Sequence, residues 1–272
     1  MRTPISYTPG NAQVIEAVRS SVYEAVLDLL GTEAIVIPLG DPKHGALSGT
    51  TVTTIGDEQL IFTASEAFSA FDTPPGSKSI IPVLTLNDVD EDIVSPDNAV
   101  WTRALAPASW GAWVYMTDAT TAYIFTKTDG IGHERREWQM WLNGSDQFEM
   151  TLFDEDDAVT PNASILSKAD SAISENTWVF LVATYDGSAD ASGINLYQDG
   201  SLVASTDLDD ANFVSMRNKD ASVALGSVND PPNLLFGGKM AGGPIGPFYV
   251  KAELTADAVL RLYEVGRRAL NL

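Results

Sequence analysis

Residues 177–205 read TWVFLVATYDGSADASGINLYQDGSLVAS, and this stretch decides the fold. Its first run, Trp178–Tyr185, is apolar at nearly every position, which predicts a central strand covered on both faces. Asp199-Gly200 separates two further strand-like runs, and this dipeptide accepts the positive φ angles of a type I′ turn. We therefore expect a hairpin in which Leu196 lies opposite Val203, and Tyr197 opposite Leu202.

Similar runs recur on both sides of this stretch, with turn signals between them. From residue 101 onward they are SWGAWVYM, AYIFTK, EWQMWL, QFEMTLF, NTWVFLVATY, INLYQ, SLVAST, SVALG and GPFYVKAEL. Many short strands at such spacing indicate an antiparallel all-β sandwich or barrel. The region ends in TADAVLRLYEVGRR, where Thr255 can cap a short helix with Ala258, Leu262 and Val265 facing inward.

An amphipathic helix is predicted over Asn11–Leu30, with Asn11 as N-cap and Gly31 as its stop. Apolar residues recur along it at steps of four, four, four and three, which is one stripe of a helix. The stripe consists of Val14, Val18, Val22, Val26 and Leu29. Such a stripe must be buried, and two destinations stay open: its own sandwich, or an oligomerisation or docking contact with other subunits.

These patterns divide the chain into an N-terminal arm and helix, residues 1–31, and a sandwich, residues 32–272, best supported over 101–272. The short β-like runs of residues 32–100 either begin the sandwich or form a separate layer. Within them, residues 87–98 carry five acids and are predicted to be an exposed connection.

Four pieces of the chain, in order, resemble the laminin G-like/concanavalin A-like lectin-glucanase superfamily. They are SWGAWVYM (109–116), AYIFTKTD with EWQMWL, TWVFLVATYDG (177–187) with INLYQDGSLVAS (194–205), and ALGS with FGGKMAGGPIGPFYVKAELTADAVLRLYEVG. The chain departs from the family at Gly243–Gly246, where the family has an acid and an aliphatic residue. The resemblance implies a mainly β, antiparallel two-sheet jelly-roll sandwich, with the N-terminal helix and a short C-terminal helix attached.

The resemblance also implies that calcium is a candidate cofactor, because family members often hold one ion at the sandwich rim through oxygen ligands. The acidic run Asp154, Asp156 and Asp157 is one candidate, and Asp207, Asp209 and Asp210 are another. Neither run has EF-hand spacing, and charge runs of this kind are usually solvated turns, so no cofactor is required.

Catalysis is not predicted. The chain has no cysteine and only two histidines, His44 and His133, in glycine-flanked segments that read as loops. It carries no E-x-D-x-E motif, which retaining glucanases of this fold use, and no G-x-S-x-G, P-loop or dinucleotide fingerprint. The acids of residues 88–92 read as a solvated loop. A glycoside hydrolase remains a third hypothesis, which needs paired acids.

The charge balance excludes some partners. With 37 acidic and 16 basic residues, the net charge is −21 and the pI about 4.2. This field disfavours nucleic acid and anionic membranes, and it suits high solubility or a saline habitat. The opening MRTPISYTPGN lacks an apolar signal-peptide core, so we expect folding in the cytoplasm.

Two functions follow as expectations. The first is a non-enzymatic virion structural protein of a bacteriophage, such as a capsid decoration, turret, fibre or tail component. It would assemble in the host cytoplasm as a homo-oligomer with other virion proteins, and display the sandwich towards host glycans. The alternative is a carbohydrate-binding lectin or adhesin, for which Trp101, Trp138 and Trp141 are candidate aromatic platforms, although tryptophans in such strands are more often core.

Overall fold

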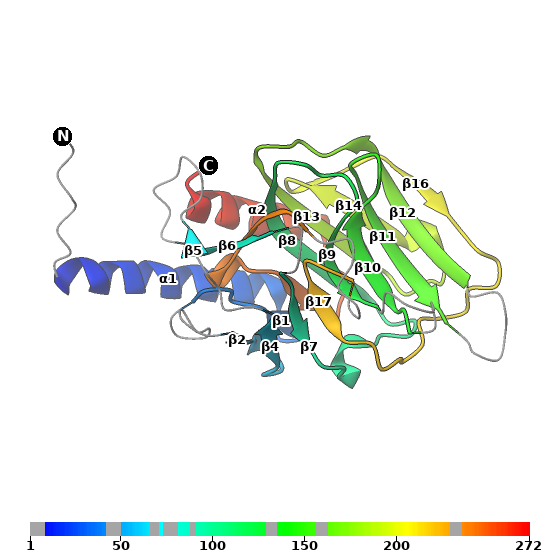
Figure 1. Cartoon of the computed structure of the whole chain (residues 1–272), viewed down its shortest axis with the longest axis horizontal. Helices are drawn as coiled ribbons and strands as arrows, with labels where there is room; N and C mark the ends of the chain where they lie inside the picture. The colour runs from blue at the N-terminus through cyan, green and yellow to red at the C-terminus, as the bar shows by residue number, and fades with distance from the viewer. Residues whose placement is uncertain are drawn as a thin grey trace.

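The chain forms an antiparallel β-sandwich with a helix near each end of the sequence (Figure 1). A computed structural model describes residues 9–41, 50–65, 71–72, 81–87, 91–128, 135–155, 163–228 and 236–272. The helices are α1 (Pro9–Leu30) and α2 (Ala256–Leu270), with short 3-10 turns η1 (Ala99–Trp101), η2 (Ala191–Gly193) and η3 (Gly243–Ile245). Neither α-helix, over the residues described, is both long and apolar enough to cross a bilayer.

One sheet has ten strands in the order β15-β14-β13-β8-β18-β6-β5, and β19 joins β8 to β1 and β3. Its strands are β1 (Ala34–Val36), β3 (Ile55–Gly56), β5 (Phe71–Asp72), β6 (Val83–Leu86), β8 (Ala108–Met116), β13 (Trp178–Tyr185), β14 (Ile194–Gln198), β15 (Ser201–Leu202), β18 (Gly238–Ala241) and β19 (Phe248–Val250).

The second sheet has nine strands in the order β16-β12-β11-β10-β9-β17-β7-β4-β2. Its strands are β2 (Thr51–Thr53), β4 (Ile61–Ala64), β7 (Ile93–Ser95), β9 (Ala122–Lys127), β10 (Trp138–Leu142), β11 (Gln147–Asp154), β12 (Ala163–Ala172), β16 (Ser205–Leu208) and β17 (Val223–Leu225). The predicted fold class is confirmed.

Residues 32–100 supply strands to both sheets, so this segment is part of the sandwich and not a separate layer. The exposed connection expected over residues 87–98 is wrong in part. Residues 93–95 form β7, which pairs with β4 and β17. Asp92, counted among the solvated acids, is buried and accepts a 2.9 Å hydrogen bond from the Ser227 hydroxyl.

The stretch that decides the fold behaves as predicted. Every residue of β13 is buried. Tyr197 pairs with Leu202 across the turn, and the Val203 N–H donates to the Leu196 carbonyl at 3.0 Å. Asp199 and Gly200 have φ angles of 51° and 79°, as a type I′ turn requires.

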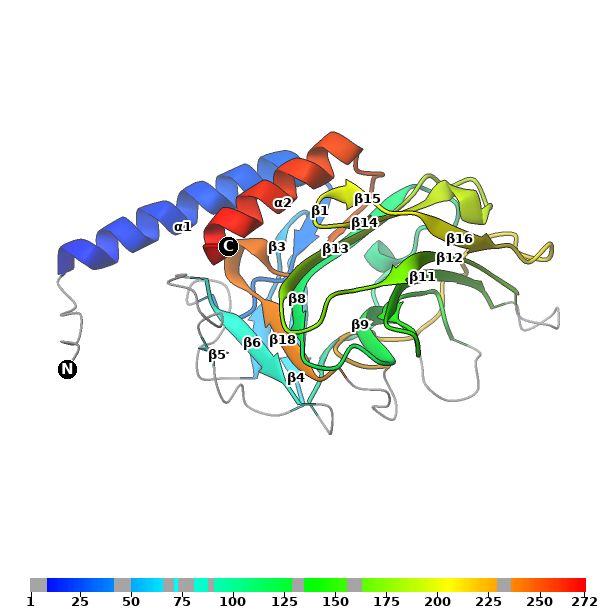
Figure 2. The same cartoon turned by 90° about the horizontal axis from the view of Figure 1, so that it is seen from above.

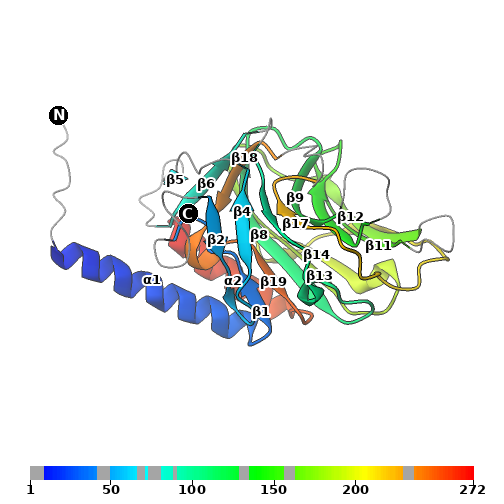
Figure 3. The same cartoon turned by 60° about the horizontal axis from the view of Figure 1, so that its bottom comes forward.

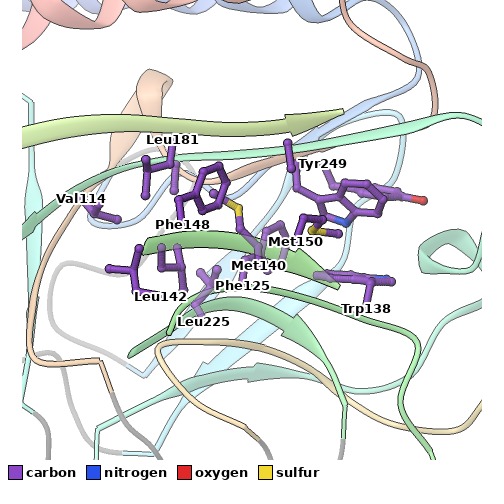
Figure 4. Packing of buried hydrophobic residues seen from close by; sticks show 14 of the residues in the cluster. Val114, Phe125, Trp138, Met140, Leu142, Phe148, Met150, Leu181, Leu225 and Tyr249 are labelled. Carbon is purple, nitrogen blue, oxygen red and sulfur yellow. The ribbon is translucent and has the colours of Figure 1, made fainter. Parts of the chain in front are cut away.

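The main core lies between the two sheets and is rich in aromatic rings (Figure 4). Trp138 and Tyr249 stack with their ring centroids 6.3 Å apart, and Trp101 and Trp110 pack against the same tyrosine. All four side chains are fully buried. Trp101 and Trp138 therefore stabilise the sandwich and are not available as sugar platforms.

A second core lies between the outer face of the ten-stranded sheet and the helices, which run side by side over it (Figure 2). Thr255 caps α2 by accepting from the Ala258 N–H, as predicted. The fully buried stripe of α2 is Val259, Leu262, Gly266 and Leu270; of the residues expected inside, Ala258 and Val265 are only partly buried.

Gly266 marks the closest approach of α2 to the sheet. A Cβ atom at this position would lie 2.2 Å from Nε1 of Trp113. The Trp113 ring is itself held by stacking on Phe180 and Tyr263, at centroid distances of 5.1 and 5.5 Å. Only glycine fits between the helix backbone and this indole.

Helix α1 begins at Pro9, so Asn11 lies inside the helix and the prediction that it is the N-cap is wrong. The helix ends as predicted, with Gly31 in the left-handed conformation at φ 83°. Val26 and Leu30 are buried in the second core, and Val22 and Leu29 pack against it. This part of the stripe is therefore covered by its own chain. The N-terminal part of α1 projects beyond the sandwich (Figure 3), and the side chains of Val14 and Val18 lie outside the described residues.

A buried ion-pair network ties β9 to distant loops. The Lys127 ammonium lies 2.6 Å from Glu137 and 2.8 Å from Asp97, and it donates to the carbonyls of Lys219 and Ala221. Lys127 and Glu137 are fully buried. Multiple hydrogen bonds compensate the cost of removing these charges from water.

Candidate functional site

The two sheets differ in what covers their outer faces. Both helices pack on the ten-stranded sheet, and among the described residues no helix lies over the outer face of the nine-stranded sheet (Figure 2). This second face carries both aromatic and charged side chains. It is the candidate functional surface.

One row of side chains crosses this face. Strand register places Tyr123 of β9 opposite Trp141 of β10, Trp141 opposite Glu149 of β11, and Glu149 opposite Lys168 of β12. At about 4.8 Å between strands, the row is about 14 Å long. It therefore places two aromatic rings, then a carboxylate, then an ammonium group side by side, over a length that suits several sugar units. Trp141 and Lys168 are partly exposed, whereas Tyr123 and Glu149 are buried, with 8% and 6% of their surface exposed.

A β-bulge creates the aromatic pair. Met140 pairs with Phe125, but Trp141 pairs with Tyr123, so Ile124 is the extra residue on β9. The bulge lets Ile124 and Phe125 both enter the core and brings Tyr123 beside Trp141 on the outer face. The two rings stack with centroids 5.2 Å apart and planes within 10°, which fixes the half-buried indole as a rigid apolar surface.

Hydrogen bonds hold the polar part of the row. The Thr151 hydroxyl donates to Glu149 at 3.0 Å, and the Asn143 amide donates to the other carboxylate oxygen at 3.4 Å. The Trp141 indole N–H donates to Thr151 at 3.4 Å. The indole and the carboxylate are thus oriented by one shared hydroxyl.

The electrostatics of the row favour hydrogen bonding over proton transfer. Burial chiefly, and the negative charge of Glu149, raise the pKa of Tyr123, an effect that Arg136 opposes. The phenol therefore keeps its proton at neutral pH and remains a donor.

Glu155 is too far from Glu149 to form a catalytic pair with it. Glu155 lies six residues further along, roughly 20 Å at strand spacing. Its carboxylate accepts a 2.5 Å bond from Arg136, whose guanidinium also lies 4.3 Å from the centre of the Phe153 ring. A glycosidase needs two carboxyl groups roughly 5 to 9.5 Å apart.

The acidic run predicted for calcium is only partly described. Asp154 accepts bonds from Arg217 at 2.7 Å and from the N–H groups of Val214 and Ser215. Burial opposes its ionisation, but these bonds outweigh that effect and lower its pKa. Its oxygens are therefore occupied by protein donors. Asp156 and Asp157 lie outside the described residues, as do His44 and His133.

Of the alternative run, Asp209 accepts a hydrogen bond from the N–H of Ala191 in η2, and Asp210 accepts one from the Asn212 N–H within a local turn. Among the described residues, one cluster of three carboxylates could share a cation. It consists of Asp118, Asp146 and Glu175, whose oxygens lie within 4.8 Å of one another. Carboxylate oxygens suit hard cations such as calcium. The sequence pattern did not reveal this group, because its members are distant in the chain.

Sequence reasoning selected Trp141 for the candidate surface but missed Tyr123, Glu149 and Thr151. The signal was present in QFEMTLF (Gln147–Phe153), where polar and apolar residues alternate. Alternation with period two places Phe148, Met150 and Leu152 in the core and the residues between them on the opposite face.

A family model described as the Concanavalin A-like lectin/glucanases superfamily matches residues 88–242. No curated protein matches the chain in sequence. Solved structures with similar folds include the binding domain of Paraclostridial Mosquitocidal Protein 1, with 12% identity, a TM-score of 0.53, and coverage of 85% of this chain and 51% of that one.

A second is botulinum neurotoxin type C, described as entering cells through interaction with two ganglioside molecules, with 11% identity, a TM-score of 0.55 and the same coverage, 85% and 51%. A third is Trypanosoma rangeli sialidase in complex with 2,3-difluoro-KDN, with 10% identity, a TM-score of 0.54, and coverage of 96% and 40%. The chain thus spans about half the length of the two toxin chains. At these identities the likeness shows the fold.

Proposed function

The chain belongs to the concanavalin A-like lectin/glucanases superfamily, and on that premise we propose that it is a non-catalytic carbohydrate-binding protein whose binding surface is the outer face of the nine-stranded sheet. The observation that carries the proposal is the stacked Tyr123–Trp141 pair in register with Glu149. Sugars offer an apolar C–H face and a rim of hydroxyls. The aromatic pair fits the first, and the carboxylate and its hydrogen-bonded neighbours fit the second.

Two features of the described acids favour binding over catalysis. Glu149 and Glu155 are too far apart for a catalytic pair, as estimated above. Asp118, Asp146 and Glu175 are close together, but the backbone N–H of Thr120, with its hydroxyl, lowers the pKa of Asp118. Asp118 is therefore ionised at neutral pH and does not suit the role of a glycosidase's general acid, which needs a raised pKa.

Titration calorimetry with neutral and acidic oligosaccharides tests this function. Trp141→Ala should weaken binding at least about 30-fold, the equivalent of a 2 kcal/mol hot spot, and Trp141→Phe should keep most of it. Leu208→Ala, on the exposed edge strand β16 of the same sheet, is the matched control and should bind normally. Equal affinity of the wild type and Trp141→Ala would contradict the proposal.

A structural role in a virus particle, with the chain as a homo-oligomer among other virion proteins, is a second candidate. The observation that favours it is the N-terminal part of α1, which projects beyond the sandwich (Figure 3). Residues Val26 and Leu30 pack internally, so a chain starting at Ser20 keeps this packing and loses only the projecting part.

Light scattering of both forms gives the test. An assembly role predicts a discrete oligomer for the full chain and a monomer for the chain starting at Ser20. Monomers in both cases would count against the assembly role and leave the carbohydrate proposal untouched.

A further inference from the structure

A pocket of about 370 Å³ lies at one end of the sandwich, and none of the four residues of the aromatic row lines it. It is enclosed by the ends of β6 and β8, the start of β18 and the β8–β9 turn. Strand register places Thr85, Lys239 and Tyr115 side by side across β6, β18 and β8 at its base. Its volume falls at the lower end of the range for small-molecule sites.

The wall of the pocket combines polar and apolar groups, and its two charged side chains are of opposite sign. It presents the hydroxyls of Thr85, Thr117 and Thr120, together with one carboxylate, Asp118, and one ammonium, Lys239. The Thr120 N–H donates to Asp118 at 2.9 Å, and this bond chiefly lowers the pKa of Asp118, so the carboxylate is ionised at neutral pH. A wall of hydroxyls with one charge of each sign favours a neutral ligand that both donates and accepts hydrogen bonds.

Tyr115 adds an apolar surface to this wall. Its ring is half-buried and packs against Trp178, with centroids 5.8 Å apart and planes tilted by 59°. This packing limits the movement of the ring. An aromatic ring beside hydroxyls and a carboxylate combines the two features that a sugar ring requires.

Two other ligand classes fit less well. Phosphates and other anions would meet Asp118 with Asp146 and Glu175 close behind it, in a protein of net charge −21. Apolar ligands would displace water from the threonine hydroxyls and the two charged groups and would offer no hydrogen bond in return.

We propose that this pocket is a second carbohydrate site, which takes one neutral sugar unit. Its position supports a shared ligand class, because Ala122 lines the pocket and the next residue, Tyr123, begins the aromatic row. The Thr120 hydroxyl also donates to Asp146 at 2.8 Å, which links the pocket to the β10–β11 turn. The choice of sugar as ligand rests on the proposed function; the location and polarity of the site do not.

The test uses the full-length protein and saturation-transfer NMR with glucose, galactose, mannose and N-acetylglucosamine. Glucuronate and glucosamine are the charged comparators. At least one neutral sugar should give a signal, and its affinity should fall about tenfold or more in Asp118→Asn, since a charge-assisted hydrogen bond is lost. Asparagine can still accept from the Thr120 N–H, so the turn should fold. Lys239→Met, which keeps the aliphatic stem, should also weaken binding.

Trp141→Ala separates this proposal from the proposed function. Monosaccharide binding that persists in Trp141→Ala but is lost in Asp118→Asn supports the pocket as a sugar site, even if no oligosaccharide binds the outer face. Three results would overturn the pocket: no signal from any neutral sugar, stronger binding of a charged comparator, or loss of the signal in Trp141→Ala alone. Comparing the affinity for the free sugar with that for the same sugar at the non-reducing end of an oligosaccharide shows whether the ligand is a monosaccharide or the end of a glycan.

Discussion

Replacing Gly266 by alanine should destabilise the protein, although the same change normally stabilises a helix. Alanine is favoured over glycine inside a helix by about 1 kcal/mol. Here the new Cβ would lie 2.2 Å from Nε1, 2.7 Å from Cε2 and 3.0 Å from Cζ2 of Trp113. Ordinary contact begins at 3.4 Å, so the closest gap must widen by about 1.2 Å (3.4 − 2.2).

Neither partner can make that movement at low cost. The indole is stacked on Phe180 and Tyr263, and α2 is held by the buried residues Leu262 and Leu270. Overpacking of this kind costs about 1–3 kcal/mol. With the upper value and the gain in helix propensity, we expect Gly266→Ala to lower the free energy of unfolding by about 2 kcal/mol.

Urea denaturation and thermal unfolding measure this effect. At roughly 2–4 °C per kcal/mol, the melting temperature should fall by about 4–8 °C. Gly144→Ala is the matched control, because its Cβ would meet only the Thr121 hydroxyl, at 3.6 Å; we expect a change within about 0.5 kcal/mol. A Gly266→Ala protein as stable as the wild type, or more stable, would refute close packing of α2 on Trp113.

Three further predictions concern stability. Leu30→Ala should lower the free energy of unfolding by about 2–5 kcal/mol in urea denaturation, because Leu30 is buried in the second core. The control Asp28→Ala, at an exposed position of the same helix, should have little effect. Similar urea midpoints for the two variants would argue against internal packing of α1. Glu137→Gln should cost about 3–5 kcal/mol, and adding Lys127→Met should restore part of the loss; a double variant worse than the single would contradict this. The pKa of Asp154 is lower in the folded state than its unfolded value of about 3.9, so the ionised carboxylate stabilises the fold above that value. This stabilisation is lost as the pH falls through the folded pKa. The urea midpoint should therefore depend less on pH between about pH 3 and 7 in Asp154→Asn than in the wild type.

Local signals in the sequence were sufficient for the elements whose structure is determined locally. Asp199-Gly200 fixed a hairpin register, and Gly31 and Thr255 fixed helix ends, because each acts through the backbone within a few residues. The continuous apolar run of β13 indicated that both faces are covered, and the second core supplies the second cover.

Features that depend on distant residues were not predictable in this way. The bulge at Ile124 depends on the pairing of β9 with β10 and is not encoded in the run AYIFTK. Asp92 was taken for a solvated acid because its partner, Ser227, lies 135 residues away. The destination of the Val22–Val26 stripe likewise needed the fold, since an apolar helix face has the same pattern whether it packs internally or against another subunit.

Because the Lys127 amine is buried, its chemical reactivity reports how often the fold opens locally around β9. Acylating reagents modify lysine side chains only where the uncharged amine reaches solvent, and this side chain has no exposed surface in the folded chain. Its rate of labelling, followed by peptide mass spectrometry, would therefore measure how often β9 and the loops around it separate. The partly exposed Lys168 would provide the comparison in the same sample.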